Sequence, residues 1–398
     1  MSMIEKKAIL IGCGISGPVM ALFLKRIGIE TIIYEAQTQY RDDVGAFLGI
    51  SPNGLNVLKE LMPLENILTD FTPGKMAFFN GKNKNIGEID NANQTELYGA
   101  ETVQLKRGLL NKAIREVAIA NGINIELGKK LTSITQTEKT ATVFFNDGTS
   151  ATADFIIGCD GIHSTTRKLL FPNGPKPVYT GLLSTGGLTK LANVQNLYGS
   201  IRMIFGERAF FAYAVSNLGD VWWFNNISRE KEPSRNELTA MELNHLKNTL
   251  LALHKNDPEP ITDIIKSANK VEIYPVYDIP FLEKWHRGRV CLIGDSAHAT
   301  APHIGQGASL ALEDTIVLAK CIRDLPSLEA AFAKFQALRQ DRVKKIVREA
   351  RKVGNNKRAP NKFQQFFRDL LLPFFVKMEA KKMDWVYSYK VDWNEKII

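Results

Sequence analysis

The stretch from 294 to 314, GDSAHATAPHIGQGASLALED, combines several groups that can do chemistry. Asp295, His298 and His303 have the side chains of metal ligands or of a catalytic triad, whereas the two glycines of GQG suit a loop that approaches a cofactor. A metal site is disfavoured, because the two histidines share one Ala/Thr/Pro loop and have no third ligand at a suitable spacing. A triad fragment and a cofactor site both stay open. The elements predicted around the stretch are needed to distinguish these two interpretations.

A dinucleotide signal lies near the N-terminus. KAILIG, PVMALFLKRIG and TIIYE read in turn as a buried strand, an amphipathic helix and a second buried strand, which predicts a βαβ unit. GCGISG occupies its first turn with the spacing G-x-G-x-x-G, which lets the backbone turn tightly, approach a pyrophosphate and pack the helix on the strand. Glu35, at the end of the second strand, can accept hydrogen bonds from a ribose diol. We predict a dinucleotide site at Gly12, Gly14, Ile15, Ser16, Gly17 and Glu35, with FAD and NAD both open at this point.

Two further motifs resemble a known family. CDGIHSTTR (159–167) is similar to the Asp-Gly fingerprint of the class A flavoprotein monooxygenases, the p-hydroxybenzoate hydroxylase-like family. The 294–314 stretch is similar to the second flavin motif of that family, and GAFLGISPNGLNVLKEL (45–61) resembles a loop and helix of its salicylate hydroxylase-like branch. Arg107 matches an arginine that reaches the FAD in the family. The resemblance covers residues 5–355 and implies that the dinucleotide is FAD.

The resemblance also implies roles for single residues. Asp295, at the carboxyl end of a buried strand, would accept from the ribityl hydroxyls, and the helix that begins after GQG would face the flavin pyrimidine and stabilise the anionic reduced ring. His298 is expected to make a structural hydrogen bond, and Arg167 would face phosphate or ribose oxygens. Position 303 varies within the family, so His303 either fills the loop or faces the cavity as a proton relay. The implied FAD-binding residues beyond the first turn are Arg107, Asp160, Gly161, Asp295, Pro302, Gly305, Gln306, Gly307 and Ala308.

The remaining elements predict an α/β fold, in which a Rossmann-like FAD-binding domain is interrupted by an antiparallel sheet and followed by a helical segment. SIRMIF, ERAFFAYAV and DVWWFNN are strand-like runs separated by turns, which predicts an antiparallel meander, and 235–254 reads as a helix. RVCLIGD then returns to the buried-strand pattern. We expect an FAD-binding domain over 1–174 and 271–355, a substrate-binding sheet over 175–270 and C-terminal helices over 356–398.

The aromatic meander is the expected wall of a substrate cavity. We predict that this cavity is lined by Phe205, Phe211, Tyr213, Trp222, Phe224 and Pro302. Arg208 and Tyr213 are the polar groups on one of its strands, and we expect them, with His303, to orient the substrate or take part in catalysis. The meander contains no histidine, so the histidine base of some phenol hydroxylases in the family has no counterpart here.

The resemblance implies a monooxygenase. In such an enzyme NAD(P)H reduces the FAD, O2 adds at the flavin C4a, and the resulting hydroperoxide delivers one oxygen atom to an aromatic or polycyclic small molecule. The motifs look closest to the urate hydroxylase and zeaxanthin epoxidase-like group, which favours a small heteroaromatic substrate, but tetracycline-inactivating enzymes share them. A flavin-dependent reductase or dehydrogenase, and a membrane-associated FAD redox protein with a basic aromatic tail, are the alternatives of other classes.

Composition narrows the class of protein further. Lys and Arg outnumber Asp and Glu by 51 to 42, which favours anionic ligands, but no nucleic-acid motif accompanies the basic residues. The cysteines lack metal-finger spacing and fit a reducing cytoplasm without disulfides: they are Cys13, Cys159, Cys291 and Cys321. Glycines interrupt the apolar N-terminus, which argues against a signal peptide, and no run is long enough to span a membrane. We expect a cytoplasmic monomer or weak dimer that contains no metal.

Overall fold

A computed structural model describes residues 6–42, 47–66, 74–191, 194, 197, 199–216, 219–239, 241–356 and 383–397 of the 398-residue chain. A six-stranded sheet in the order β17-β18-β11-β1-β2-β7 forms one half of the molecule, and its neighbouring strands are parallel except for the β17–β18 pair. The strands are β1 (Lys7–Ile11), β2 (Glu30–Tyr34), β7 (Asn124–Glu126), β11 (Phe155–Gly158), β17 (His286–Arg287) and β18 (Val290–Leu292). The predicted βαβ unit is confirmed, as is the return of the chain to this sheet after residue 289.

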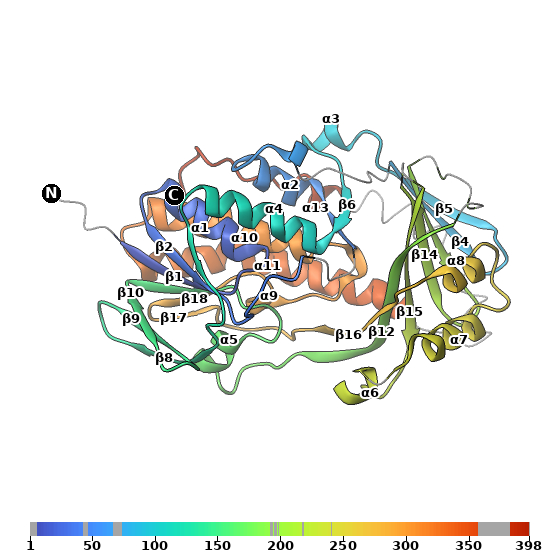
Figure 1. The fold of residues 1–398 in the computed structure, drawn as a ribbon. Coiled ribbons are helices and arrows are strands. Elements are labelled where there is room, and N and C mark those ends of the chain that lie inside the picture. The colour runs from blue at the N-terminus through green and yellow to red at the C-terminus, as the bar shows by residue number, and fades with distance from the viewer. Residues whose placement is uncertain are drawn as a thin grey trace.

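Helices cover this sheet and connect its strands (Figure 1). The principal ones are α1 (Ser16–Arg26), α4 (Arg107–Ala120), α5 (Thr165–Leu170), α9 (Asp295–His298), α10 (Gly307–Asp324) and α11 (Leu328–Asn356). The helices differ in burial: α1 and α10 are buried on nearly every side and lie in the core, while α11 alternates between buried and charged positions. Among the described residues, no helix combines the length and apolar character that crossing a membrane requires.

Short elements complete this half. They are β3 (Phe47–Ile50), α2 (Pro52–Lys59), η1 (Leu64–Asn66), α3 (Gln94–Tyr98), β6 (Val103–Lys106), η2 (Pro302–Ile304) and α13 (Asp384–Tyr387). β8 (Leu131–Gln136), β9 (Ala141–Phe145) and β10 (Ser150–Ala153) form a separate antiparallel sheet, and the β9–β10 turn is the hairpin that Asn-Asp-Gly favours. The C-terminal helices predicted over 356–398 fall mostly on 357–382, outside the described residues.

A seven-stranded sheet in the order β16-β12-β15-β14-β13-β4-β5 forms the other half. Its strands are β4 (Lys75–Asn80), β5 (Asn85–Asp90), β12 (Val178–Lys190), β13 (Ser200–Phe205), β14 (Phe210–Val215), β15 (Asp220–Ser228) and β16 (Glu272–Asp278). β13, β14 and β15 are the predicted antiparallel meander. The sheet also takes β4 and β5 from before, and β16 from after, the range 175–270.

Three helices accompany this sheet: α6 (Arg235–Thr239), α7 (Leu243–Leu253) and α8 (Ile261–Ser267). The single helix expected over 235–254 is therefore divided into α6 and α7. In Figure 1, α7 and α8 lie on the side of the sheet that faces away from α10 and α11. Their apolar side chains pack against the sheet in a core of their own, which includes Leu246, Leu250 and Ile264. One face of the sheet is thus closed by helices, and the other face turns toward the six-stranded half.

Candidate functional site

One cavity of about 1420 Å³ lies between the two halves. Gly12, Glu35 and Asp295 line it from the carboxyl end of the six-stranded sheet, where open α/β sheets bind ligands. Phe205 and Phe224 line it from the seven-stranded sheet. The volume exceeds the roughly 300 to 1,000 Å³ that a drug-sized ligand needs, so the cavity has room for two ligands in contact.

The turn between β1 and α1 forms one end of the cavity. Gly12 has a φ of +105°, and a Cβ atom there would lie 2.6 Å from the Cys159 carbonyl oxygen, so only glycine fits. A Cβ at Gly17 would lie 2.1 Å from the Gly12 oxygen, which explains the close packing of helix on strand. By contrast, a Cβ at Gly14 would meet nothing within 4 Å. Gly14, Ile15 and Ser16 therefore border open space at a helix N-terminus, where a pyrophosphate fits.

Glu35 lies at the end of β2 and lines the same part of the cavity. One of its carboxylate oxygens accepts from the Cys13 amide at 2.7 Å and the other from the Gln37 amide at 2.9 Å. These two bonds fix the carboxylate, and each oxygen keeps a lone pair for a further donor. The position matches the predicted ribose-binding role.

The turn that follows β11 also lines the cavity. Asp160 and Gly161 line the cavity, but the Asp160 carboxylate accepts from the Ser164 hydroxyl at 2.5 Å and the Thr166 amide at 2.9 Å, so it holds its own turn. Burial raises the pKa of Asp160, and these hydrogen bonds partly offset that rise. Arg167 does not face the cavity, because its guanidinium donates to two buried carbonyl oxygens, which corrects the expected contact with phosphate.

Asp295 and Arg107 line the middle of the cavity from α9 and from the start of α4. Burial raises the pKa of Asp295, whereas the positive charge of Arg107 opposes that rise. The pair thus presents a carboxylate acceptor and a cationic donor. Both suit the polyhydroxyl chain that links a flavin ring to its pyrophosphate.

The GQG turn forms the next wall of the cavity. Gly305 is left-handed with φ +63°, and Gly305, Gly307 and Ala308 line the cavity at the N-terminus of α10. Gln306 points away, since its Oε1 accepts from Asn53 at 3.1 Å and its Nε2 donates to Ser51 at 2.8 Å. The glycines therefore leave room for a ligand at the helix N-terminus, while Gln306 fastens the turn to α2.

These groups together fit FAD. The Gly14 turn has space for the pyrophosphate, Glu35 faces the expected ribose, Asp295 and Arg107 suit the ribityl chain, and the start of α10 suits the flavin ring. When bound, FAD supplies the redox and oxygen-activating chemistry that protein side chains lack. Within the described part of the chain, no cluster of three or more His, Cys, Asp or Glu side chains could hold a metal ion.

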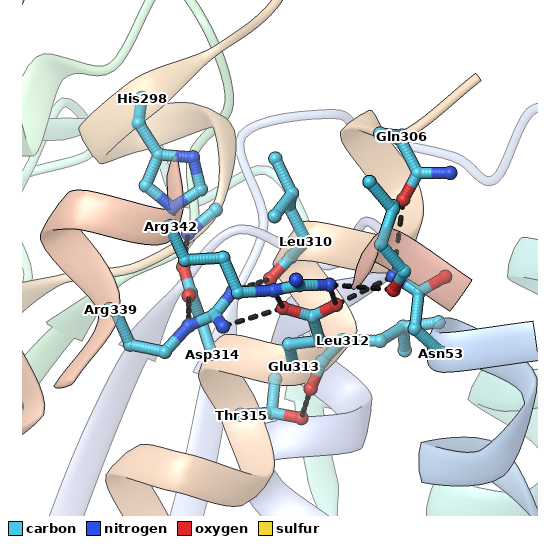
Figure 2. A network of polar contacts seen from close by, with 12 residues as sticks. Asn53, His298, Gln306, Leu310, Leu312, Glu313, Asp314, Thr315, Arg339 and Arg342 are labelled. Atoms are coloured by element: carbon cyan, nitrogen blue, oxygen red, sulfur yellow. Dashed lines mark hydrogen bonds and ion pairs between the residues drawn. The ribbon is translucent and has the colours of Figure 1, made fainter. Parts of the chain in front are cut away.

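A buried ionic cluster lies behind the GQG turn (Figure 2). Glu313 and Asp314 of α10 face Arg339 and Arg342 of α11: Arg339 lies 2.5 Å from Glu313 and 2.8 Å from Asp314, and Arg342 lies 2.8 Å from Glu313. Asn53 donates to Glu313 at 2.6 Å and so links the cluster to the Gln306 contact. The cluster joins α2, α10 and α11, and it positions the turn that faces the flavin ring.

His298 belongs to this cluster rather than to a metal site. Its Nε2 lies 2.6 Å from the Asp314 carboxylate, which is the structural hydrogen bond expected from the sequence. Burial alone would raise the pKa of Asp314, but His298 and Arg339 outweigh that effect and lower it. His303, in contrast, lines the cavity and packs against Gly354 near the end of α11.

The wall formed by the seven-stranded sheet is mostly apolar. Phe205, Phe224 and Pro302 line the cavity as predicted. Further apolar lining residues of the sheet were not predicted: Met76, Phe78, Ile89, Ile201, Met203 and Phe210. Several of them come from β4 and β5, whose position in this sheet has no local signal in the sequence.

Four of the residues predicted for substrate binding or catalysis do not reach the cavity. Phe211 and Tyr213 point to the opposite face of β14, because side chains alternate along a strand and Phe210 faces the cavity. Trp222 is buried and pairs with Leu188 and Ala214 farther along the sheet. Arg208 is exposed in the turn before β14 and donates to the Ala252 carbonyl oxygen at 3.5 Å. These positions correct the predicted lining and orienting residues.

The sequence analysis also missed polar residues of the seven-stranded sheet that line the cavity. Those with uncharged side chains are Ser184 on β12, Asn226 on β15 and Tyr274 on β16. For Asn226 a signal existed, since it lies two residues beyond Phe224 and so shares its face of the strand. Ser184 and Tyr274 carried no such signal, because β12 and β16 were not predicted to join the meander.

Comparison with known proteins agrees with this geometry. Residues 5–350 match the family described as FAD binding domain. The chain is 28% identical over 355 residues to the FAD-dependent urate hydroxylase of Klebsiella pneumoniae, covering 87% of this chain and 89% of that protein. The crystal structure of Klebsiella pneumoniae HpxO complexed with FAD and uric acid aligns with a TM-score of 0.84 and 25% identity over 96% of both chains. Tetracycline destructase Tet(55) has the same fold, with a TM-score of 0.74 and 19% identity over 99% of this chain and all of that one.

The fold and the site define an FAD-binding protein of the α/β class with a second, mostly antiparallel sheet. The chain belongs to the FAD binding domain family, and within it to the class A flavin monooxygenases, so it is an FAD-dependent monooxygenase.

Proposed function

We propose that the protein is an NAD(P)H-consuming hydroxylase of aromatic or heteroaromatic small molecules. The observation that carries this proposal is the continuity of the cavity, in which the GQG turn and Pro302 face an apolar wall that includes Phe205, Phe210 and Phe224. An apolar wall excludes water and holds a flat ring at a fixed distance from the flavin site, as oxygen insertion requires. NAD(P)H would act as a transient co-substrate, because the sequence contains no second dinucleotide fingerprint.

His303 is the residue we propose for proton transfer. It lines the cavity beside Pro302, at the boundary between the flavin site and the sheet wall. Imidazole exchanges protons near neutral pH, so it can accept a proton from a ring hydroxyl or nitrogen as oxygen is inserted.

A tetracycline-type polycyclic substrate is the second candidate. It is favoured by the size of the cavity, about 1420 Å³, which exceeds the roughly 300 to 1,000 Å³ typical of a ligand pocket. Urate-sized rings and polycyclic ligands are therefore both included in the test below.

The test is substrate-stimulated NAD(P)H oxidation by the yellow holoenzyme. A panel of purines, phenols, quinolones and tetracyclines is assayed with NADH and NADPH, and oxidation is compared with oxygenated product. At least one ring compound should stimulate oxidation and yield a hydroxylated product. A reductase or dehydrogenase would instead consume NAD(P)H and form no oxygenated product, and a redox partner protein would show no stimulation by any compound.

The cellular setting belongs to the same proposal. All four cysteines are free and buried, which fits the reducing cytoplasm that we propose for the protein. The cavity is built from one chain, which is compatible with a monomer or weak dimer.

A further inference from the structure

A row of polar side chains crosses the otherwise apolar sheet wall. Ser184 on β12 pairs in register with Asn226 on β15 and with Tyr274 on β16. Side chains at paired positions of neighbouring strands point to the same face of a sheet. All three residues line the cavity, so they form a continuous polar row along one side of it.

Two residues of this row, Ser184 and Asn226, are buried, whereas Tyr274 is 38% exposed. Asn226 is only 3% exposed and Ser184 only 4%. The Asn226 Oδ1 is buried and has no hydrogen-bond partner among the described residues. Buried polar groups are nearly always paired in proteins, and leaving one unpaired costs about 1–3 kcal/mol. The unpaired Asn226 amide lines the cavity, so a ligand there can supply the missing hydrogen bond.

The row lies close to the flavin site. Leu182 and Val276 share its face of β12 and β16, and both pack against Ala301, the neighbour of Pro302. Ser184 lies two residues from Leu182 on β12, and Tyr274 lies two residues from Val276 on β16. A ligand bonded to the row would therefore lie next to the loop that faces the flavin ring, with Phe210 and Phe224 beside it.

The sheet wall offers no positive charge to a ligand. Among the described residues of the sheet that line the cavity, the sole charged side chain is Glu272, which pairs with Lys270 at 2.8 Å. Lys352 of α11 also lines the cavity, but it pairs with Glu349 at 2.8 Å. A carboxylate placed against this wall would lose hydration without gaining a cation, which is costly. A neutral polar edge would avoid that cost.

We propose that Ser184, Asn226 and Tyr274 bind a neutral aromatic substrate through hydrogen bonds to a ring N–H or O–H and a neighbouring acceptor, and that the wall selects against carboxylated rings. The proposal rests on the proposed hydroxylase function and adds the chemical class of its substrate. Asn226 supplies both an acceptor and a donor, so it can recognise a ring that presents the two groups side by side.

The experiment compares two probes that differ by one carboxylate: quinolin-4-one and 4-hydroxyquinoline-2-carboxylate. Binding to the FAD-loaded enzyme is measured by the change in flavin absorbance, without NAD(P)H, so that binding is separated from turnover. Wild type should bind quinolin-4-one at least about tenfold more tightly. Asn226→Leu and Ser184→Ala should each weaken quinolin-4-one binding by about tenfold and leave the carboxylate probe unchanged.

Ser150→Ala, at an exposed position on β10, is the matched control and should bind both probes as wild type does. FAD content and melting temperature verify that each variant is folded. Equal or tighter binding of the carboxylate probe, wild-type binding by both cavity variants, or no binding of either probe below about millimolar concentration would overturn the inference. The NAD(P)H oxidation panel decides the hydroxylase function separately, because turnover of a carboxylated ring would refute this inference and still support hydroxylation.

Discussion

Glu35 shows how a single carboxylate can be fixed for one task. Its two backbone hydrogen bonds orient it toward the cavity without using all of its acceptor capacity. We expect Glu35→Gln to keep the fold and to weaken FAD binding by about tenfold, because hydrogen bonds to a charged acceptor are stronger than those to a neutral one. Titration of the apoprotein with FAD, followed by flavin fluorescence, measures this change.

Glu30→Gln is the matched control for that titration. Glu30 begins the same strand, but it is paired with Lys7 at the protein surface. FAD affinity in this variant should equal that of wild type. Equal affinities for Glu35→Gln and wild type would remove Glu35 from the FAD site.

His303 carries the second prediction for a single residue. Because it lines the cavity and an imidazole can transfer a proton to or from the reacting group, His303→Ala should lower kcat by about 100-fold and flatten the pH profile of turnover. Turnover is measured with whichever ring compound stimulates NAD(P)H oxidation. His245→Ala, at an exposed position of α7, should leave both kcat and the profile intact. An unchanged pH profile in His303→Ala would exclude the proton-transfer role.

Single residues also show what a motif can and cannot predict. Gly12, Gly14 and Gly17 could be assigned separate roles, because each role follows from backbone space that the spacing itself defines. Gln306 and Arg167 lie in equally recognisable motifs, yet they turn away from the cavity to partners far along the chain. The sequence pattern does not encode which of these partners is nearby, so their roles could not be read from it.

At the scale of elements, the contact between α10 and α11 depends on buried charge. Arg339 is fully buried and bridges Glu313 and Asp314. Arg339→Met would leave these carboxylates partly unpaired, so we expect a loss of about 3–5 kcal/mol in the free energy of unfolding at pH 7. Urea denaturation measures the loss, and Arg348→Met, an exposed position on the same helix, should leave the stability unchanged.

The same variant gives a pH dependence with a defined sign. The pKa of Asp314 is lowered in the folded protein, since His298 and Arg339 outweigh the effect of burial. Its ionised form therefore adds stability that is complete above the unfolded value near pH 4 and is lost as the pH falls through the lower folded value. The stability difference between wild type and Arg339→Met should shrink below about pH 4. A difference that stays constant from pH 7 to pH 3 would contradict this account of the cluster.

The sequence pattern predicted which segments form strands of the sheet, but not which side chains of each strand point into the cavity. The meander could be predicted from its apolar runs and turns, but in β14 every residue is buried, so the sequence does not distinguish the cavity face from the helix face. Phe211 and Tyr213 were placed in the cavity for this reason. The opposite face is covered by α7 and α8, whose packing is long-range and leaves no local pattern.

At the scale of the whole molecule, the cavity lies where the carboxyl end of the six-stranded sheet approaches one face of the seven-stranded sheet. Figure 1 shows that the two sheets are built from interleaved segments of the chain. The βαβ unit and the flavin motifs could be predicted, since their signals are local. The pairing of β4 with β13 could not, because it joins segments more than a hundred residues apart in parallel. The same long-range pairing places Met76 and Phe78 in the cavity wall.

The two halves are also joined by a direct contact. Arg351 of α11 donates to Asp278 of β16 at 2.5 Å and 3.1 Å. The helix that anchors the buried cluster thus reaches the sheet that carries the polar row. Through α11, the GQG turn and the seven-stranded sheet are therefore connected by direct contacts.

The most direct test of the central claim is an oxygen-labelling experiment. The holoenzyme is supplied with NAD(P)H, a stimulating ring compound and ¹⁸O₂, and the product is analysed by mass spectrometry. The account predicts one ¹⁸O atom in each product molecule, formed in proportion to the NAD(P)H consumed. Product without ¹⁸O, or NAD(P)H consumption that yields only hydrogen peroxide with every compound that binds, would contradict it.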